Sequence, residues 1–180
     1  MFDLQPTLVG ECLTLRPLLA EDREALAAVA SDPLIWAQHP DPARSTRTGF
    51  DRFFDQALES RGTLVAIEAT TGQIIGCSRY HGHKPGLEVT IGYTFLARAY
   101  WGGRYNGEMK RLMLRHAFHH VEAVKFRIAE RNLRSRRAVE KLGALLVGPE
   151  DTPQFGQIHV IYRLTEAHWS GAKAMHYTAA

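Results

Sequence analysis

Residues 91–110 constrain the fold most, because an apolar run typical of a strand leads into a glycine-rich turn and then into an amphipathic helix. Gly102, Gly103 and Gly107 can adopt positive φ, which lets backbone N–H groups converge on one point. A helix that begins near Asn106 adds the positive end of its dipole. The segment therefore predicts a site for a phosphate or pyrophosphate, although glycines before a helix can also serve only to turn the chain.

The residues of this turn narrow the class of phosphate ligand. Gly102 and Gly107 have the spacing of a GxxxxG loop, but Glu108 and Met109 occupy the positions where a nucleoside triphosphatase needs Lys and then Ser or Thr. The dinucleotide pattern GxGxxG is also missing, since Arg104 stands in place of its second glycine. The ligand is therefore expected to be neither a nucleoside triphosphate with magnesium nor a dinucleotide.

Length and composition predict one domain spanning residues 1–180. A chain of 180 residues that is 45% hydrophobic can bury about 70% of its unfolded surface in a single core. The 22 basic and 19 acidic residues leave a net charge of +3, and the excess is local. It lies in Arg131, Arg134, Arg136, Arg137 and Lys141. One such cluster without interleaved aromatic residues does not predict nucleic-acid binding.

The cysteines and the hydropathy pattern predict a cytoplasmic protein without a membrane partner. Cys12 and Cys77 each stand alone in a strand-like segment, which favours a reducing compartment. Residues 1–4 lack the charged start and apolar core of a secretory signal, and no apolar run approaches the roughly 20 residues of a membrane span.

Periodicity and turn residues predict an alternation of strands and helices. Strands are expected at residues 12–16, 64–68, 74–80, 88–96, 124–129, 145–147 and 158–164, with a loop at 81–86. Helices are expected at residues 21–30, 45–60, 106–120 and 132–142, the last one ended by Gly143, and a partly ordered tail at 165–180. The middle strands form an antiparallel meander, and a βαβ-like unit closes the chain.

Three segments together resemble the GNAT N-acetyltransferase superfamily. They read TIGYTFL at 90–96, YWGGRYNGE at 100–108 and NLRSRRAVEKLGA at 132–144. The closest likeness is to its RimJ/RimL-like branch, which acetylates protein N-terminal amines. The resemblance extends from residues 13–17 to 160–164. It implies an α/β acyl-CoA N-acyltransferase fold with a mixed, mostly antiparallel sheet flanked by helices.

The resemblance also assigns residues to acetyl-CoA, the acyl donor. Residues 91–96 splay from 125–129 in such folds, so that the pantetheine arm pairs with the backbone of the first strand as an added strand would. The residues assigned to acetyl-CoA are Tyr93, Phe95, Gly102, Gly103, Arg104, Tyr105, Asn106, Gly107, Asn132 and Arg137. Asn132 would bond the pantetheine, and Arg134, Arg136 or Arg137 would meet the 3′-phosphate.

The catalytic assignments depart from the family pattern. Thr90 stands where many relatives carry a Glu, so Glu88, on the same strand face, is the substitute base. Val139 stands where the wider superfamily often has a Tyr acid, so Ser135 is the preferred donor to the leaving thiolate. No metal is expected, because His81 and His83 lack a third ligand and read as surface residues.

Each assignment has an alternative. Asn132 is also a natural helix N-cap, Glu88 can be purely structural, and the arginines can form a solvated face with Arg136 paired to Glu140. The acceptor is expected to be a protein or peptide N-terminus, with a small-molecule amine next. A non-catalytic acyl-CoA-binding module stays open, and a homodimer is compatible with the sequence. Residues 149–156, which help to wall the acceptor cleft in this fold, form a shorter connection than expected.

Overall fold

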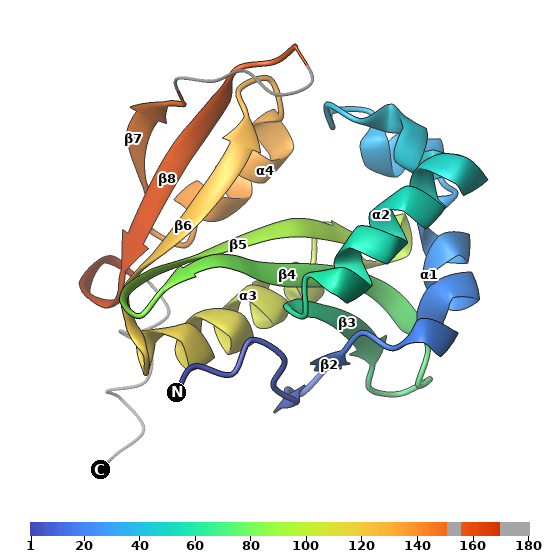
Figure 1. Cartoon of the computed structure of the whole chain (residues 1–180), viewed down its shortest axis with the longest axis horizontal. Helices are drawn as coiled ribbons and strands as arrows, with labels where there is room; N and C mark the ends of the chain where they lie inside the picture. Colours follow the sequence, from blue (N-terminus) through green and yellow to red (C-terminus); the bar gives the residue numbers. More distant parts are fainter. Residues whose placement is uncertain (151–155, 170–180) are drawn as a thin grey trace.

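The computed structural model describes residues 1–150 and 156–169. Within them, eight strands form one sheet in the order β1-β2-β3-β4-β5-β6-β8-β7 (Figure 1). Neighbouring strands run antiparallel except β5 and β6, which run parallel. Helices flank this mixed sheet, as the predicted α/β fold class requires.

The element bounds follow the predicted order closely. The strands are β1 (Leu8–Val9), β2 (Leu13–Pro17), β3 (Thr63–Glu68), β4 (Ile74–Lys84), β5 (Gly86–Leu96), β6 (Val121–Ala129), β7 (Leu145–Pro149) and β8 (His159–Thr165). The α-helices are α1 (Arg23–Ala30), α2 (Arg47–Glu59), α3 (Arg104–Phe118) and α4 (Leu133–Glu140). Short 3₁₀ helices are η1 (Ala20–Asp22), η2 (Pro33–Trp36), η3 (Pro42–Ser45), η4 (Arg98–Tyr100) and η5 (Glu166–His168).

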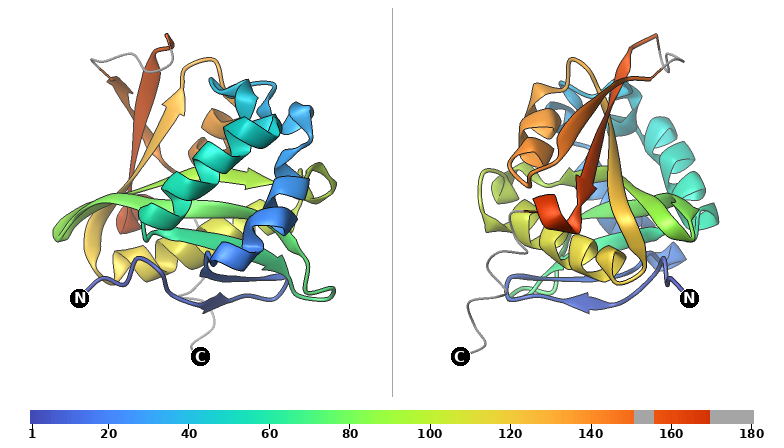
Figure 2. Two further views of the ribbon diagram at one scale, coloured as in Figure 1. Left: turned by 45° about the vertical axis from the view of Figure 1, so that its right-hand side comes forward. Right: turned by 90° about the vertical axis from the view of Figure 1, so that its left-hand side faces the viewer.

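Two hydrophobic clusters lie on the two faces of the sheet, because each helix presents one apolar stripe. α1 and α2 cover one face, where Phe50 and Phe54 pack near Val65 of β3 (Figure 2). α3 covers the other face through Met109 and Met113. The structure thus places α2 and α3 on opposite sides of the sheet.

The prediction of a loop at residues 81–86 was wrong. β4 continues to Lys84 and β5 begins at Gly86, so that only Pro85 separates the two strands. His81 pairs with Thr90, and the register shifts between His81 and Lys84. Cross-strand pairing therefore overrides the local turn signals, and the one extra residue of β4 is absorbed as a bulge.

Three further features of the fold differ from the prediction. β1 was not predicted, because two residues are too few for a periodic pattern. β8 lies between β6 and β7, so that the two strands of the predicted βαβ-like unit are not neighbours in the sheet. Residues 166–168 of the expected tail form η5, and Trp169 is buried against Phe118.

Residues 170–180, the rest of the predicted tail, lie outside the described residues, as does most of the 149–156 connection. None of the helices in the described part of the chain combines the length and apolar composition needed to cross a lipid bilayer.

Candidate functional site

The glycine turn leads directly into α3. Gly102 has φ of +69°, the left-handed conformation that favours glycine, and Gly103 is the N-cap residue with φ of −117°. α3 begins at Arg104, two residues before the predicted start, so that Gly107 is helical and adopts no positive φ. Positive φ was therefore correct for Gly102 and wrong for Gly103 and Gly107. Tyr105 therefore belongs to the first helical turn together with Asn106, the predicted first helical residue.

The glycines at the start of α3 border open space. A helix leaves its first N–H groups without an intrahelical acceptor, and Gly103 has no side chain to accept from them. A Cβ added at Gly102 or Gly107 would meet no described atom within 4 Å, and one added at Gly103 would meet only the Trp101 carbonyl at 4.0 Å. Backbone donors and the helix dipole thus point at a space that an anion can enter.

β5 and β6 part beside this turn. Their pairing runs from Gly86 with Val121 to Thr90 with Lys125 and ends there. Figure 1 shows the two strands diverging from this point. This confirms the predicted splay, and among residues 1–150 and 156–169 the facing backbone of residues 91–96 has no strand partner on that side.

A bulge in β5 accompanies the splay. Tyr93 has φ of +52°, an uncommon value for a residue with a bulky side chain, and the β4–β5 register shifts between Cys77 and Arg79. Tyr93 lies at the predicted pantetheine-binding stretch, and the residue is 40% exposed. Phe95, the other predicted residue there, buries its ring between α2 and η2 while its backbone stays in β5.

Asn132 has the capping role that the sequence offered as an alternative. Its Oδ1 accepts a hydrogen bond from the Ser135 amide at 3.2 Å, at the start of α4. Asn132 is buried and Ser135 is half-buried. Since capping uses one side-chain oxygen, it leaves the Asn132 amide group and the Ser135 hydroxyl to other partners.

The predicted arginines divide into two groups. Arg136 donates to the Tyr162 hydroxyl at 2.9 Å, which in turn donates to Glu140 at 2.5 Å, so that the predicted Arg136–Glu140 pair is bridged by a tyrosine. Arg134 donates to the Ile35 carbonyl at 2.9 Å. Arg104 and Arg137, by contrast, are exposed, and they remain the predicted phosphate contacts.

Glu88 lies beside the closed end of the splay. Its carboxylate is 2.8 Å from Lys84 Nζ and 2.9 Å from Lys125 Nζ. Hydrogen bonds from these two lysines hold the pKa of Glu88 below its usual range, so that the carboxylate binds a proton weakly. These contacts favour the structural alternative, and a role for Glu88 as base remains a prediction.

Lys110 of α3 is buried beneath the bulge. Its Nζ donates to Thr94 Oγ1 at 2.6 Å and to Ser78 Oγ at 3.2 Å, and its exposed fraction is 6%. Burial lowers the pKa of Lys110 from 10.5 to about 7. Between pH 7 and 10.5 the unfolded chain therefore holds a proton that the folded chain has lost, so that Lys110 makes stability rise with pH in this window.

Replacing Lys110 by methionine is expected to remove this pH dependence. The linkage predicts that the free energy of unfolding of the wild type rises by about 2 kcal/mol from pH 7 to pH 9 through this residue alone. Urea unfolding of both proteins at the two pH values measures the difference in slope. Equal slopes would show that Lys110 is charged in the folded protein.

Two arginines beside Tyr93 were not predicted from the sequence. Arg44 of η3 and Arg79 of β4 are both buried, with exposed fractions of 8% and 5%. The sequence could have identified Arg79, because it is a charged residue within the apolar run of β4. Arg44 lies in a proline-rich connection and has no such distinguishing pattern. His81, predicted as a surface loop residue, is half-buried in β4, with its ring 5.2 Å from that of Tyr93.

The glycine turn and the splay lie apart from two hollows on the surface of the protein. One hollow lies between α1 and the β3–β4 hairpin, and a second between α1 and the start of α2. Neither is lined by residues of the glycine turn or the splay. No cluster of three metal-ligating side chains occurs within residues 1–150 and 156–169.

A sheet that opens between parallel neighbours, next to an unobstructed glycine turn and helix N-terminus, is the arrangement expected of an acyl-CoA-dependent transferase. A family model described as acetyltransferase (GNAT) domain matches residues 13–145. The chain therefore belongs to the GNAT acetyltransferase family, which transfers acyl groups from acyl-CoA to amines. No protein with a curated description matches the chain in sequence.

Solved structures of acetyltransferases share the fold. A GCN5-related N-acetyltransferase from Brucella melitensis has a TM-score of 0.83 at 19% identity, over 98% of this chain and 86% of the other. An acetyltransferase from Agrobacterium tumefaciens has a TM-score of 0.69 at 24% identity, over 88% and 94%. A ribosomal-protein-S5-alanine acetyltransferase from Vibrio fischeri has a TM-score of 0.67 at 17% identity, over 92% and 100%.

Proposed function

We propose that the chain transfers an acetyl group from acetyl-CoA to the N-terminal amine of a protein or peptide. The observation that carries the proposal is the open β5–β6 splay beside the unobstructed glycine turn. A diphosphate at this turn would be held by backbone N–H groups, and a pantetheine arm would extend β5 beyond Thr90.

Different segments of the chain would bind different parts of acetyl-CoA. The first-turn amides from Gly103 to Gly107 would hold the diphosphate, with Arg104 adding charge. The backbone of Tyr93 and Phe95 would pair with the pantetheine amides. Asn132 would contact the same arm from the start of α4, and the exposed Arg137 would meet the 3′-phosphate.

Acetyl transfer to an amine depends on positioning of the two substrates and needs no covalent enzyme intermediate. The neutral amine attacks the thioester carbonyl carbon, a C–N bond forms and the C–S bond breaks. Backbone N–H groups stabilise the negative charge on the carbonyl oxygen. The Ser135 hydroxyl would supply the proton to the departing thiolate, and Glu88 or a water would take the proton from the amine.

An α-amine suits such a site at neutral pH. Its pKa of about 7.7–8.0 leaves a useful neutral fraction at pH 7, whereas a lysine near 10.4 is almost fully protonated. The likeness of residues 90–108 to the RimJ/RimL-like branch supports the same acceptor class. So does the fold shared with an enzyme named for an alanine of a ribosomal protein.

Release of free CoA thiol tests the proposal. Acetyl-CoA is supplied with peptides that have a free N-terminus, with the same peptides blocked at the N-terminus but carrying a lysine, and with small amines. Thiol release is expected to be fastest with the free N-termini, and absent without any amine. Acetyl-CoA binding without thiol release across the panel would identify a non-catalytic module, and release only with small amines would reassign the acceptor.

A further inference from the structure

Two buried guanidinium groups converge on the same pair of aromatic rings. Arg79 Cζ lies 4.1 Å from the ring centre of Tyr93 and 5.7 Å from that of Phe53. Arg44 Cζ lies 4.9 Å from the ring centre of Phe53 and 5.7 Å from that of Tyr93. These four residues, which we term the Arg44–Arg79 cluster, come from four different elements.

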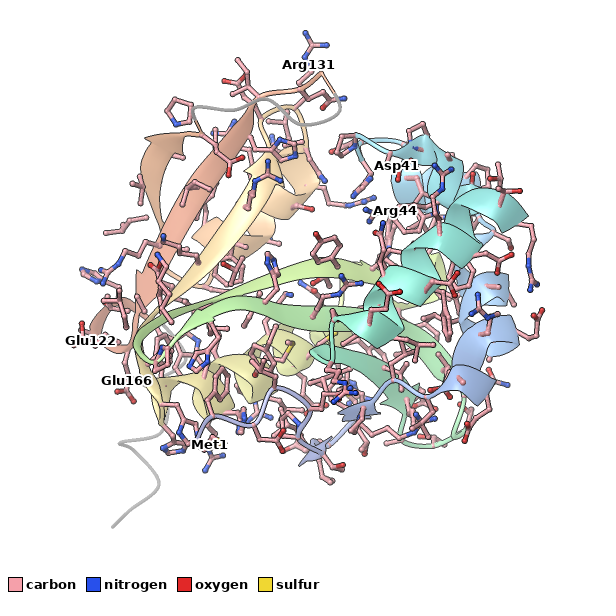
Figure 3. The ribbon with its side chains drawn as sticks, in the orientation of Figure 1. Met1, Asp41, Arg44, Glu122, Arg131 and Glu166 are labelled. Atoms are coloured by element: carbon pink, nitrogen blue, oxygen red, sulfur yellow. The ribbon has the colours of Figure 1, made fainter. Side chains whose placement is uncertain are left out.

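The fold brings them together on the α2 side of the sheet. Gly49 lets η3 press against the first turn of α2, since a Cβ there would lie 1.9 Å from the Ala43 carbonyl oxygen. This close approach holds Arg44 over Phe53 of α2. Figure 3 shows Arg44 and Asp41 beside each other, on the side of this region that faces β6 and α4. The β5 bulge places the Tyr93 ring on the same side.

The charges in the cluster do not balance. Arg79 Nε donates to Thr63 Oγ1 at 2.8 Å, but its Nη2 is buried and finds no hydrogen-bond partner among the described residues. No carboxylate in that part of the chain lies within ion-pair distance of Arg79, and Arg44 has only Asp41 at 3.3 Å. Two guanidinium charges therefore face one carboxylate.

The neighbouring histidines do not change this balance at neutral pH. His39 Nε2 lies 3.3 Å from Arg44 Nη1, and His81 contacts the Tyr93 ring. Burial lowers the pKa of each histidine to about 4, so that both are neutral at pH 7. One positive charge is left unmatched in a buried place, which is costly unless a negative group is bound there.

We propose that Arg44 and Arg79 bind a carboxylate of the acceptor, so that the preferred substrate carries an acidic group close to its reactive amine. The cluster includes Tyr93, on the strand whose free edge borders the splay. An acceptor held there by its carboxylate therefore has its amine directed at the site of acyl transfer. This proposal refines the acceptor class and rests on the proposed function.

A carboxylate fits better than a phosphate. Its single charge offsets the one unmatched cation, and its two oxygens match the planar fork of a guanidinium. The orphaned Arg79 Nη2 supplies a donor for such an oxygen. The diphosphate of the donor has a separate place at the start of α3.

Matched acceptor pairs test the proposal and separate two sources of the carboxylate. Aspartyl-alanyl-alanine amide is compared with asparaginyl-alanyl-alanine amide, and alanine with alanine amide. Calorimetry of the wild type, with and without CoA, is expected to show at least about tenfold tighter binding of the acidic member of one pair. The first pair identifies an acidic side chain in a peptide, and the second identifies a free amino acid.

The variants then assign the preference to the cluster. Arg79→Gln and Arg44→Gln are expected to reduce the preference to about threefold or less, while CoA affinity is retained as evidence of an intact fold. Arg52→Gln removes an exposed positive charge from the same helix region, α2, and is expected to keep the preference. Equal binding within both pairs, failure of all four compounds to bind, or an unchanged preference in both cluster variants would overturn the proposal.

The outcomes also separate the two proposals. An acidic preference in binding without thiol release would leave the carboxylate site standing and remove the transferase function. Thiol release with no acidic preference would do the reverse.

Discussion

Replacing Glu108 by alanine is expected to lower the free energy of unfolding by about 3–5 kcal/mol, because a buried carboxylate that holds three backbone amides is lost. Glu108 Oε1 accepts from the Glu11 amide at 2.8 Å, and Oε2 accepts from the amides of Cys12 and Leu13, each at 2.9 Å. The Cys12 thiol donates to the same oxygen at 2.8 Å. One side chain of α3 thus fastens the start of β2 to the helix.

Chemical unfolding followed by tryptophan fluorescence measures this loss. Glu108→Gln is the matched control, since it keeps the shape and one oxygen acceptor but removes the charge that strengthens these bonds. It is expected to lose less stability than the alanine variant. A loss of under about 1 kcal/mol in Glu108→Ala would show that the β2 amides find water or another acceptor instead.

Replacing Gly103 by aspartate is expected to lower the affinity for acetyl-CoA about tenfold or more, since the new carboxylate would lie against the diphosphate. The fold should tolerate the change. Gly103 has extended backbone angles that any residue adopts, and a Cβ there has open space. Aspartate is also a favourable N-cap, so stability is expected to hold or to rise by a few tenths of a kcal/mol.

Gly103→Asn separates charge from size. Asparagine caps a helix as well as aspartate does, and it has nearly the same volume without the charge. Its effect on acetyl-CoA binding, measured by calorimetry, is expected to be much smaller than that of Gly103→Asp. Unchanged binding in the aspartate variant would remove the diphosphate assignment from the α3 N-terminus, whereas equal losses in both variants would point to steric exclusion.

Local sequence was sufficient for most of the elements. The apolar stripe that contains Phe50 and Phe54 identified α2, the glycine turn marked the start of α3 to within two residues, and Asn132 was recognised as a cap. Each of these features depends on residues within a few positions of one another, through helical periodicity or capping hydrogen bonds. The resemblance of three such segments to known enzymes then supplied the family, which the family model confirms.

Local signals failed where distant pairing decided the outcome. The glycines and proline of residues 81–86 predicted a loop, yet pairing with β5 kept this segment in strands. From the sequence, Glu108 was considered only for its position after the glycine turn. In the structure, its carboxylate accepts hydrogen bonds from residues more than 90 positions away. Periodicity within one element carries no information about such contacts.

The sequence by itself thus determined the order of strands and helices, the glycine turn and the family, because these depend on neighbours along the chain. Only the tertiary structure decided that Lys110 is buried beneath the bulge of β5. It alone also brought Arg44 and Arg79 onto the same two rings with one charge unmatched. Burial, pKa and charge balance are properties of the residues that meet in space, and these meet only when the sheet and its covering helices have formed.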